Sequence, residues 1–118
     1  MPTLLVNGAP VAACELAETR KARRRGLLKR DGIDGAMLIT PCRSVHTFGM
    51  RFDIDVAYLK RAPDNAFRVL RSGSLPRRRF GRPSLRSTAI LEATAGAFAT
   101  WGLQDGSRVQ ITDEHKLQ

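Results

Sequence analysis

The chain has 118 residues, enough for one domain with its own hydrophobic core and no need of a stabilising metal or disulfide. Hydrophobic residues make up 42% of it and charged residues 26%, proportions typical of globular rather than disordered proteins. Twenty Lys and Arg against 11 Asp and Glu give a net charge of +9. This charge favours contact with nucleic acid, an anionic membrane or an acidic protein, although an arginine-rich composition alone also explains it.

No apolar run approaches the roughly 20 residues of a membrane helix. The first residues lack a basic segment, and Gly8 interrupts them before a secretory signal can form, so we expect a cytoplasmic protein. Cys14 and Cys42 are not spaced as a metal or redox motif, and two buried free thiols are expected. We expect a monomer that holds no metal and no cofactor.

The first part of the chain predicts a hairpin and a helix. Asn7-Gly8 is a strong turn signal between strands at residues 3–6 and 11–17. Thr19 fits the N-cap of a basic helix over residues 20–28. Within that helix Gly26 is unfavourable, which a close approach to a neighbouring strand would explain.

Three strands are expected in the middle of the chain, at residues 36–39, 43–48 and 52–59. In the third, Phe52, Ile54, Val56 and Tyr58 face one way, whereas Asp53, Asp55, Ala57 and Leu59 face the other. The two carboxylates therefore share a side. A turn at residues 62–65 then predicts a hairpin with a strand at 67–71.

The last part predicts a long basic loop at residues 73–86, a strand at 88–93 and a short helix at 95–101 that stops at Gly102. A final strand at 108–112 precedes a polar tail at 113–118, so the core of the single domain spans residues 3–112. These elements predict a mostly β fold of the α+β kind. We expect an open barrel or distorted sandwich of about seven short, mainly antiparallel strands with two short helices.

The stretch 44–59 has the most varied chemistry in the chain. One hypothesis is a ligand-binding site for an anionic or polar ligand at His46, Met50, Arg51 and Asp55. An enzymatic alternative uses His46 as acid or base with Asp55 and Arg25 as further catalytic candidates. In a purely structural alternative, Arg25 and Asp55 form an ion pair that holds the fold together and Met50 fills the core.

Cys42 and His46 could in principle form a thiol nucleophile and the base that activates it, the smallest set of residues that this chemistry needs. On a straight strand their Cα atoms would be about 13 Å apart, so contact requires a bend. The four Cys and His residues lack zinc-ligand spacing, and no phosphate-binding loop is present.

The basic loop offers a different interaction surface. Its candidate nucleic-acid-binding residues are Arg77, Arg78, Arg79, Phe80 and Arg82, with Phe80 able to stack on a base. The basic helix can add phosphate contacts. The alternatives are a solvated charged face and an adaptor surface for an acidic protein partner.

Several segments resemble the motifs of one family. They are Arg25-Gly26-Leu27-Leu28-Lys29-Arg30, Gly35-Ala36-Met37-Leu38, His46-Thr47-Phe48-Gly49-Met50-Arg51-Phe52 with Ile54-Asp55-Val56, and Ala89-Ile90-Leu91-Glu92-Ala93 with Gly96, Gly102-Leu103 and Gly106. Together they resemble DUF192, also called UPF0127, bacterial and archaeal proteins of unassigned function, in its His-Thr-Phe-Gly-Met subgroup. The resemblance implies a compact β-rich fold. This subgroup usually has Pro where Asp53 stands, so Asp55 is the better site candidate.

Overall fold

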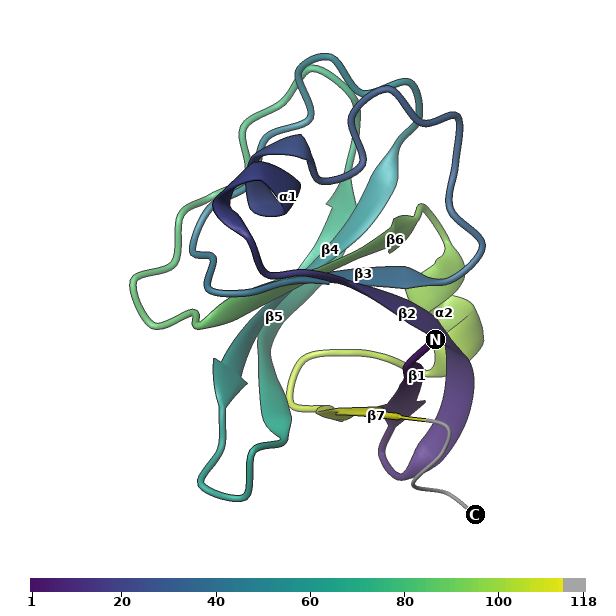
Figure 1. Ribbon diagram of the computed structural model, residues 1–118, viewed down its shortest axis with the longest axis vertical. Helices are drawn as coiled ribbons and strands as arrows, with labels where there is room; N and C mark the ends of the chain where they lie inside the picture. The colour runs from purple at the N-terminus through teal and green to yellow at the C-terminus, as the bar shows by residue number, and fades with distance from the viewer. Residues whose placement is uncertain (114–118) are drawn as a thin grey trace.

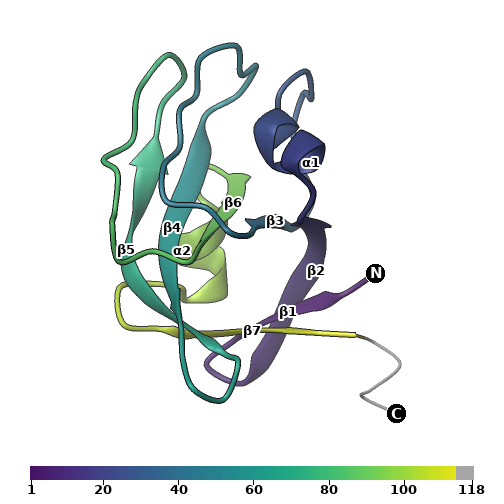
Figure 2. The same cartoon turned by 60° about the vertical axis from the view of Figure 1, so that its left-hand side comes forward.

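The computed structural model describes residues 1–113, in which seven strands close into a barrel with the order β1-β2-β3-β6-β4-β5-β7 (Figures 1 and 2). β2 and β3 run parallel, and every other neighbouring pair is antiparallel. The predicted mostly β fold with seven strands and two short helices is confirmed. In chain order the elements are β1 Thr3–Val6, β2 Ala9–Ala17, α1 Arg20–Arg25, β3 Ala36–Ile39, β4 Ile54–Arg61, β5 Phe67–Leu75, β6 Ala89–Thr94, α2 Ala97–Trp101 and β7 Arg108–Thr112.

Local turn chemistry forms the two hairpins as predicted. Asn7 and Gly8 have φ angles of 50° and 87°, the left-handed conformation that a tight two-residue hairpin turn requires. The Asn7 side chain also accepts a hydrogen bond of 2.9 Å from the Arg108 backbone N–H, which ties this hairpin to β7. In the β4–β5 hairpin, Asn65 has a φ of 69° and Asp64 accepts a hydrogen bond from Ala66.

The barrel wall separates two apolar clusters, because successive side chains of a strand point to opposite faces. One cluster includes Leu4, Leu38, Leu59, Leu91 and Val109, and Phe98 of α2 packs into it. The other cluster, which we call the outer layer, packs α1 and the loops against β3, β4 and β6. Its buried residues are Ala17, Leu27, Met37, Ile39, Ile54, Val56, Tyr58 and Ile90.

Both helices are shorter than predicted. Thr19 caps α1 by accepting a hydrogen bond of 3.0 Å from the Ala22 N–H, as expected. The helix ends at Arg25 because Gly26 adopts a φ of 48°, so Gly26 is a terminator and not an interior residue. α2 begins only at Ala97, after a left-handed Gly96. Among residues 1–113, neither helix has the length and hydrophobicity of a membrane-spanning segment.

The expected strand at residues 43–48 is wrong. This segment forms one isolated bridge, between His46 and Phe80, and otherwise bonds irregularly to the loop at residues 76–86. Gly81 donates to the Val45 carbonyl and Ser84 donates to the Arg43 carbonyl, so the backbone groups are satisfied without a regular ladder. The basic loop is also shorter than predicted, because β5 continues to Leu75.

Candidate functional site

Glu92 is a buried carboxyl group in the outer layer. It follows Ile90 by two residues on β6, so both side chains point away from the barrel interior, into which Leu91 and Ala93 point. Its side chain is only 5% exposed. Among residues 1–113 it has no hydrogen-bond or ion-pair partner, which is rare for a buried carboxyl group.

Glu92 lies at a pocket of about 80 Å³ between the end of α1 and the segment at residues 39–50. A Cβ atom placed on Gly26 would lie 3.7 Å from Glu92 Oε1, so the end of α1 lies directly over the carboxyl group. We call this cavity the Glu92 pocket. Its lining residues are Arg23, Arg24, Arg25, Gly26, Leu27, Leu28, Ile39, Cys42, Ser44, Val45, His46, Met50 and Glu92.

Burial determines the acid–base chemistry of the pocket. It raises the pKa of Glu92 from 4.5 to about 7, because little solvent and no cation stabilise the charged form. Burial also raises the pKa of the Cys42 thiol above its ordinary value of 9.0. The thiol is therefore protonated at neutral pH and is a weak nucleophile, whereas Glu92 exchanges a proton in the physiological range.

The pocket brings together three of the residues that the sequence singled out, Arg25, His46 and Met50. Cys42 joins them because the chain from residue 40 to 50 bends instead of extending as a strand. Arg51 lies apart and forms an exposed ion pair of 3.2 Å with Asp31. Its role in ligand binding stays a prediction.

Asp55 also lies apart, at the start of α2. One carboxylate oxygen accepts a hydrogen bond of 2.8 Å from the Ser74 hydroxyl, and the other accepts bonds of 3.0 Å from the N–H groups of Gly96 and Phe98. Asp55 is 4% exposed and does not line the Glu92 pocket. Within residues 1–113 no ion pair joins it to Arg25, so its contacts are those of a residue that holds β4, β5 and α2 together.

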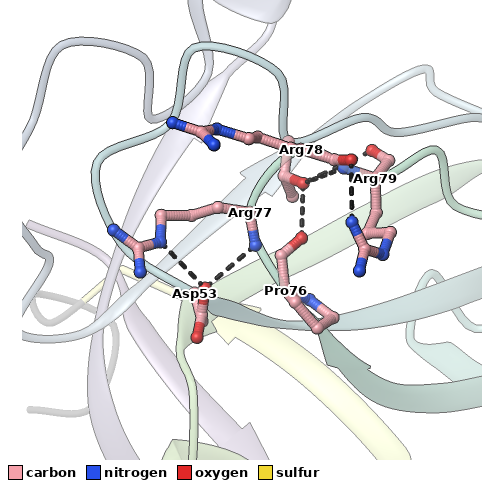
Figure 3. Close-up of polar contacts among 6 residues, drawn as sticks. Asp53, Pro76, Arg77, Arg78 and Arg79 are labelled. Atoms are coloured by element: carbon pink, nitrogen blue, oxygen red, sulfur yellow. Dashed lines mark hydrogen bonds and ion pairs between the residues drawn. The ribbon is translucent and has the colours of Figure 1, made fainter.

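Asp53 faces the basic loop and is shown with it in Figure 3. One oxygen accepts hydrogen bonds from the Arg77 backbone N–H at 2.9 Å and from Arg77 Nε at 3.2 Å. Arg79 instead contacts the carbonyl oxygen of Arg78 at 3.2 Å. Asp53 thus neutralises Arg77, while Arg78 and Arg79 form no ion pair with a carboxylate of residues 1–113.

Three aromatic rings form an exposed cluster beside these arginines. The centroids of Phe48 and Phe80 are 4.7 Å apart, and the His46 ring lies 5.9 Å from Phe48 and 6.4 Å from Phe80. Phe80 is 77% exposed and Phe48 41% exposed. We define the aromatic–arginine face as His46, Phe48 and Phe80 together with the exposed Arg78, Arg79 and Arg82.

Thr47 fixes the two segments that carry this face. It is fully buried, and its hydroxyl donates to the Pro76 carbonyl at 2.5 Å and accepts from the Arg79 N–H at 2.9 Å. The Thr47 backbone N–H donates to the Arg79 carbonyl at 2.9 Å. The backbone segments that carry the rings and the arginines are therefore joined to each other before any ligand binds.

The match to family models identifies the chain. The model of a family described as an uncharacterised group, DUF192, matches residues 3–111. The chain belongs to the DUF192 family. This confirms the resemblance found in the sequence, and no curated protein matches the chain.

Two solved structures share the fold. A protein of unknown function from Novosphingobium aromaticivorans superposes with a TM-score of 0.70 at 17% identity, over 92% of this chain and 82% of its own. A Sinorhizobium meliloti protein described as a "putative transcription regulator" also has a TM-score of 0.70, at 20% identity, over 93% of this chain and 91% of its own. At such identities these structures bear on the fold alone.

The sequence analysis did not single out Glu92 or Phe48 as site residues. For Glu92 a signal exists, because it is a lone charge inside the apolar run of residues 89–93. Phe48 carries no comparable signal. Its exposure depends on how residues 43–50 pair with the loop, which the sequence pattern does not reveal.

Proposed function

We propose that this protein binds an anionic ligand through the aromatic–arginine face, and that the ligand is single-stranded nucleic acid. The observation that carries the proposal is the exposure of Phe80 within a cluster of three rings. Large apolar side chains exposed together commonly mark an interaction surface. We further infer that the protein acts as a cytoplasmic monomer made of a single domain.

The three rings favour flat, unpaired bases as partners. Phe48 and Phe80 meet at an interplanar angle of 63°, which leaves ring surface open to solvent instead of hiding it in a stack. Bases of a single strand stack on such aromatic surfaces, whereas the bases of a duplex are already stacked on each other. Exposed rings at a basic loop therefore suit a single strand better than a duplex.

The arginines supply the charge for the backbone of that strand. Arg78, Arg79 and Arg82 are exposed and free of carboxylate partners within residues 1–113. A guanidinium group can bind a phosphate through two parallel hydrogen bonds. The net charge of +9 adds long-range attraction for any nucleic acid.

Fluorescence anisotropy tests the proposal with labelled single-stranded RNA, single-stranded DNA and duplex DNA at low and near-physiological salt. We expect both single strands to bind more tightly than the duplex, with affinity that falls as salt rises. The Arg79→Gln variant should bind more weakly and with a shallower salt slope. Arg68→Gln is the control, because Arg68 is also exposed but lies at the opposite end of β5.

Some results would contradict the proposal. Equal affinity for single strands and duplex would contradict the proposal that the rings stack on unpaired bases. The nearby Leu85 is 85% exposed, so vesicles with anionic lipids are included as a separate arm. Binding to the vesicles without binding to either single strand would reassign the face to a membrane surface.

A further inference from the structure

A second site, the Glu92 pocket, borders the aromatic–arginine face at His46 but is built on a different group, the buried Glu92 carboxyl. We infer that the Glu92 pocket binds the ammonium end of a small zwitterionic ligand, a primary amine that also carries an anionic group. Glu92 receives the ammonium group, and arginines at the end of α1 receive the anionic group. The inference rests on the missing partner of Glu92, the size of the pocket and the charges around it.

The Glu92 carboxyl group is buried but can be reached from the pocket. Among residues 1–113, Arg23 Nε is the only fully buried side-chain nitrogen or oxygen without a hydrogen-bond partner. The Glu92 oxygens also lack a partner, so each of them keeps some contact with the pocket space. A hydrogen-bond donor entering the pocket would satisfy a group that the fold leaves unsatisfied.

The volume of the Glu92 pocket limits which part of a ligand can enter it. A cavity needs on the order of 10–15 Å³ to hold one water molecule, so about 80 Å³ accommodates an ammonium group with a few carbon atoms but not a large ligand. Leu27, Ile39 and Val45 supply apolar walls for those carbons. The rest of the ligand must remain at the mouth of the pocket.

The charges around the pocket determine the chemistry of the part of the ligand that stays at its mouth. Arg24 and Arg25 are exposed and have no carboxylate partner within residues 1–113. Both arginines line the pocket, so a simple cation bound at Glu92 would be repelled by them. A ligand with a carboxylate or phosphate close to its amine instead forms ion pairs at both ends. The pocket therefore favours ligands that carry both an ammonium and an anionic group over amines that carry no anionic group.

Binding of the ammonium group depends on the ionisation of Glu92. Since its pKa is about 7 without ligand, affinity should rise about tenfold per pH unit up to that value and then level off. The ligand in turn lowers the pKa of Glu92, because a nearby cation favours the carboxylate. Other charged or titratable groups face this carboxyl group from α1, from residues 42–46 and from β4: Arg23, Arg24, Arg25, Cys42, His46 and Tyr58.

The test follows the Glu92 carboxyl carbon resonance by NMR in ¹³C-labelled protein, with binding measured at pH 8 and the pKa obtained from a titration with and without ligand. Three probes are compared. β-Alanine carries both an ammonium and a carboxylate group, propylamine carries only the ammonium group, and propionate carries only the carboxylate group. We expect β-alanine to shift the Glu92 resonance saturably, to lower its pKa and to raise Tm, with weaker effects from propylamine and none from propionate. Glu92→Gln should abolish the rise in Tm, whereas the exposed Glu18→Gln control should keep it.

Each contrary outcome overturns the inference. If β-alanine leaves the Glu92 resonance and Tm unchanged, the pocket is not an ammonium site. If propylamine binds as tightly as β-alanine, the arginines do not select a zwitterion. Should Glu92→Gln fail to fold, Arg25→Gln replaces it, and that variant must weaken β-alanine binding while leaving propylamine binding unchanged or stronger.

Discussion

The carboxylate of Asp55 accepts a hydrogen bond of 3.0 Å from the backbone N–H of Phe98, which connects β4 to the first turn of α2. The same carboxylate binds Gly96 and Ser74. Removing it would leave two backbone N–H groups without an acceptor in a partly buried position. Asp55 therefore acts on the stability of the fold.

We predict that Asp55→Ala lowers the free energy of unfolding by roughly 3 kcal/mol or more, because several hydrogen bonds to a buried charged group are lost. Urea denaturation monitored by circular dichroism measures this change. The control is Asp53→Ala, which removes exposed contacts with the side chain and the backbone N–H of Arg77 and should cost only about 1 kcal/mol. Equal costs for the two variants would show that Asp55 has no special structural role.

Glu92 should make the protein less stable as the pH rises. Its pKa is about 7 in the folded protein and 4.5 in the unfolded chain. The folded state therefore holds its proton more tightly, and stability is full below pH 4.5 and falls as pH rises through 7. The loss should reach roughly 3 kcal/mol. Unfolding measured from pH 4 to 8 should show this fall for the native protein but not for Glu92→Gln.

Thr47 should hold the basic loop in place. Thr47→Val keeps the shape of the side chain but removes its hydrogen bonds to Pro76 and Arg79. We expect a loss of about 1–3 kcal/mol in the free energy of unfolding. Amide hydrogen exchange at Arg79 should also accelerate. Thr100→Val, at an exposed threonine of α2, should change neither measurement at the loop.

Gly81 should be sensitive to the addition of a single methyl group. A Cβ atom there would lie 2.6 Å from the Tyr58 hydroxyl oxygen and 2.8 Å from Val45 Cγ1. We expect Gly81→Ala to lower the free energy of unfolding by roughly 1–3 kcal/mol, because the loop must move away from the outer layer. At Gly73 a Cβ meets no atom within 4 Å, so Gly73→Ala is the matched control. A Gly81→Ala variant as stable as the control would contradict the close packing of this loop.

Local signals predicted the parts of the fold that depend on neighbouring residues. Asn7-Gly8 gave the first hairpin turn, the alternation from Phe52 to Leu59 gave the two faces of β4, and Thr19 gave the cap of α1. The prediction of a strand at residues 43–48 failed, because this segment alternates like a strand but has only an irregular loop as its partner. Pairing between distant segments is not encoded in local periodicity.

The candidate site was predicted only in part, because it too depends on contacts between segments that are distant in the sequence. Arg25, His46 and Met50 do meet, because the end of α1 and residues 40–50 line the same pocket. Asp55 was grouped with them by its closeness in sequence, yet its strand carries it toward α2. Glu92 reaches the pocket from β6, more than 40 residues further along the chain, through barrel closure that the sequence pattern leaves open.

The most direct test of nucleic-acid binding is the affinity of Phe80→Leu for single-stranded RNA, measured by anisotropy at near-physiological salt. Leucine keeps an apolar side chain on the loop but removes the ring. Since stacking contributes about 1–3 kcal/mol per base, we predict a loss of roughly fivefold or more relative to the native protein. Unchanged affinity would contradict the proposal that the exposed rings bind bases.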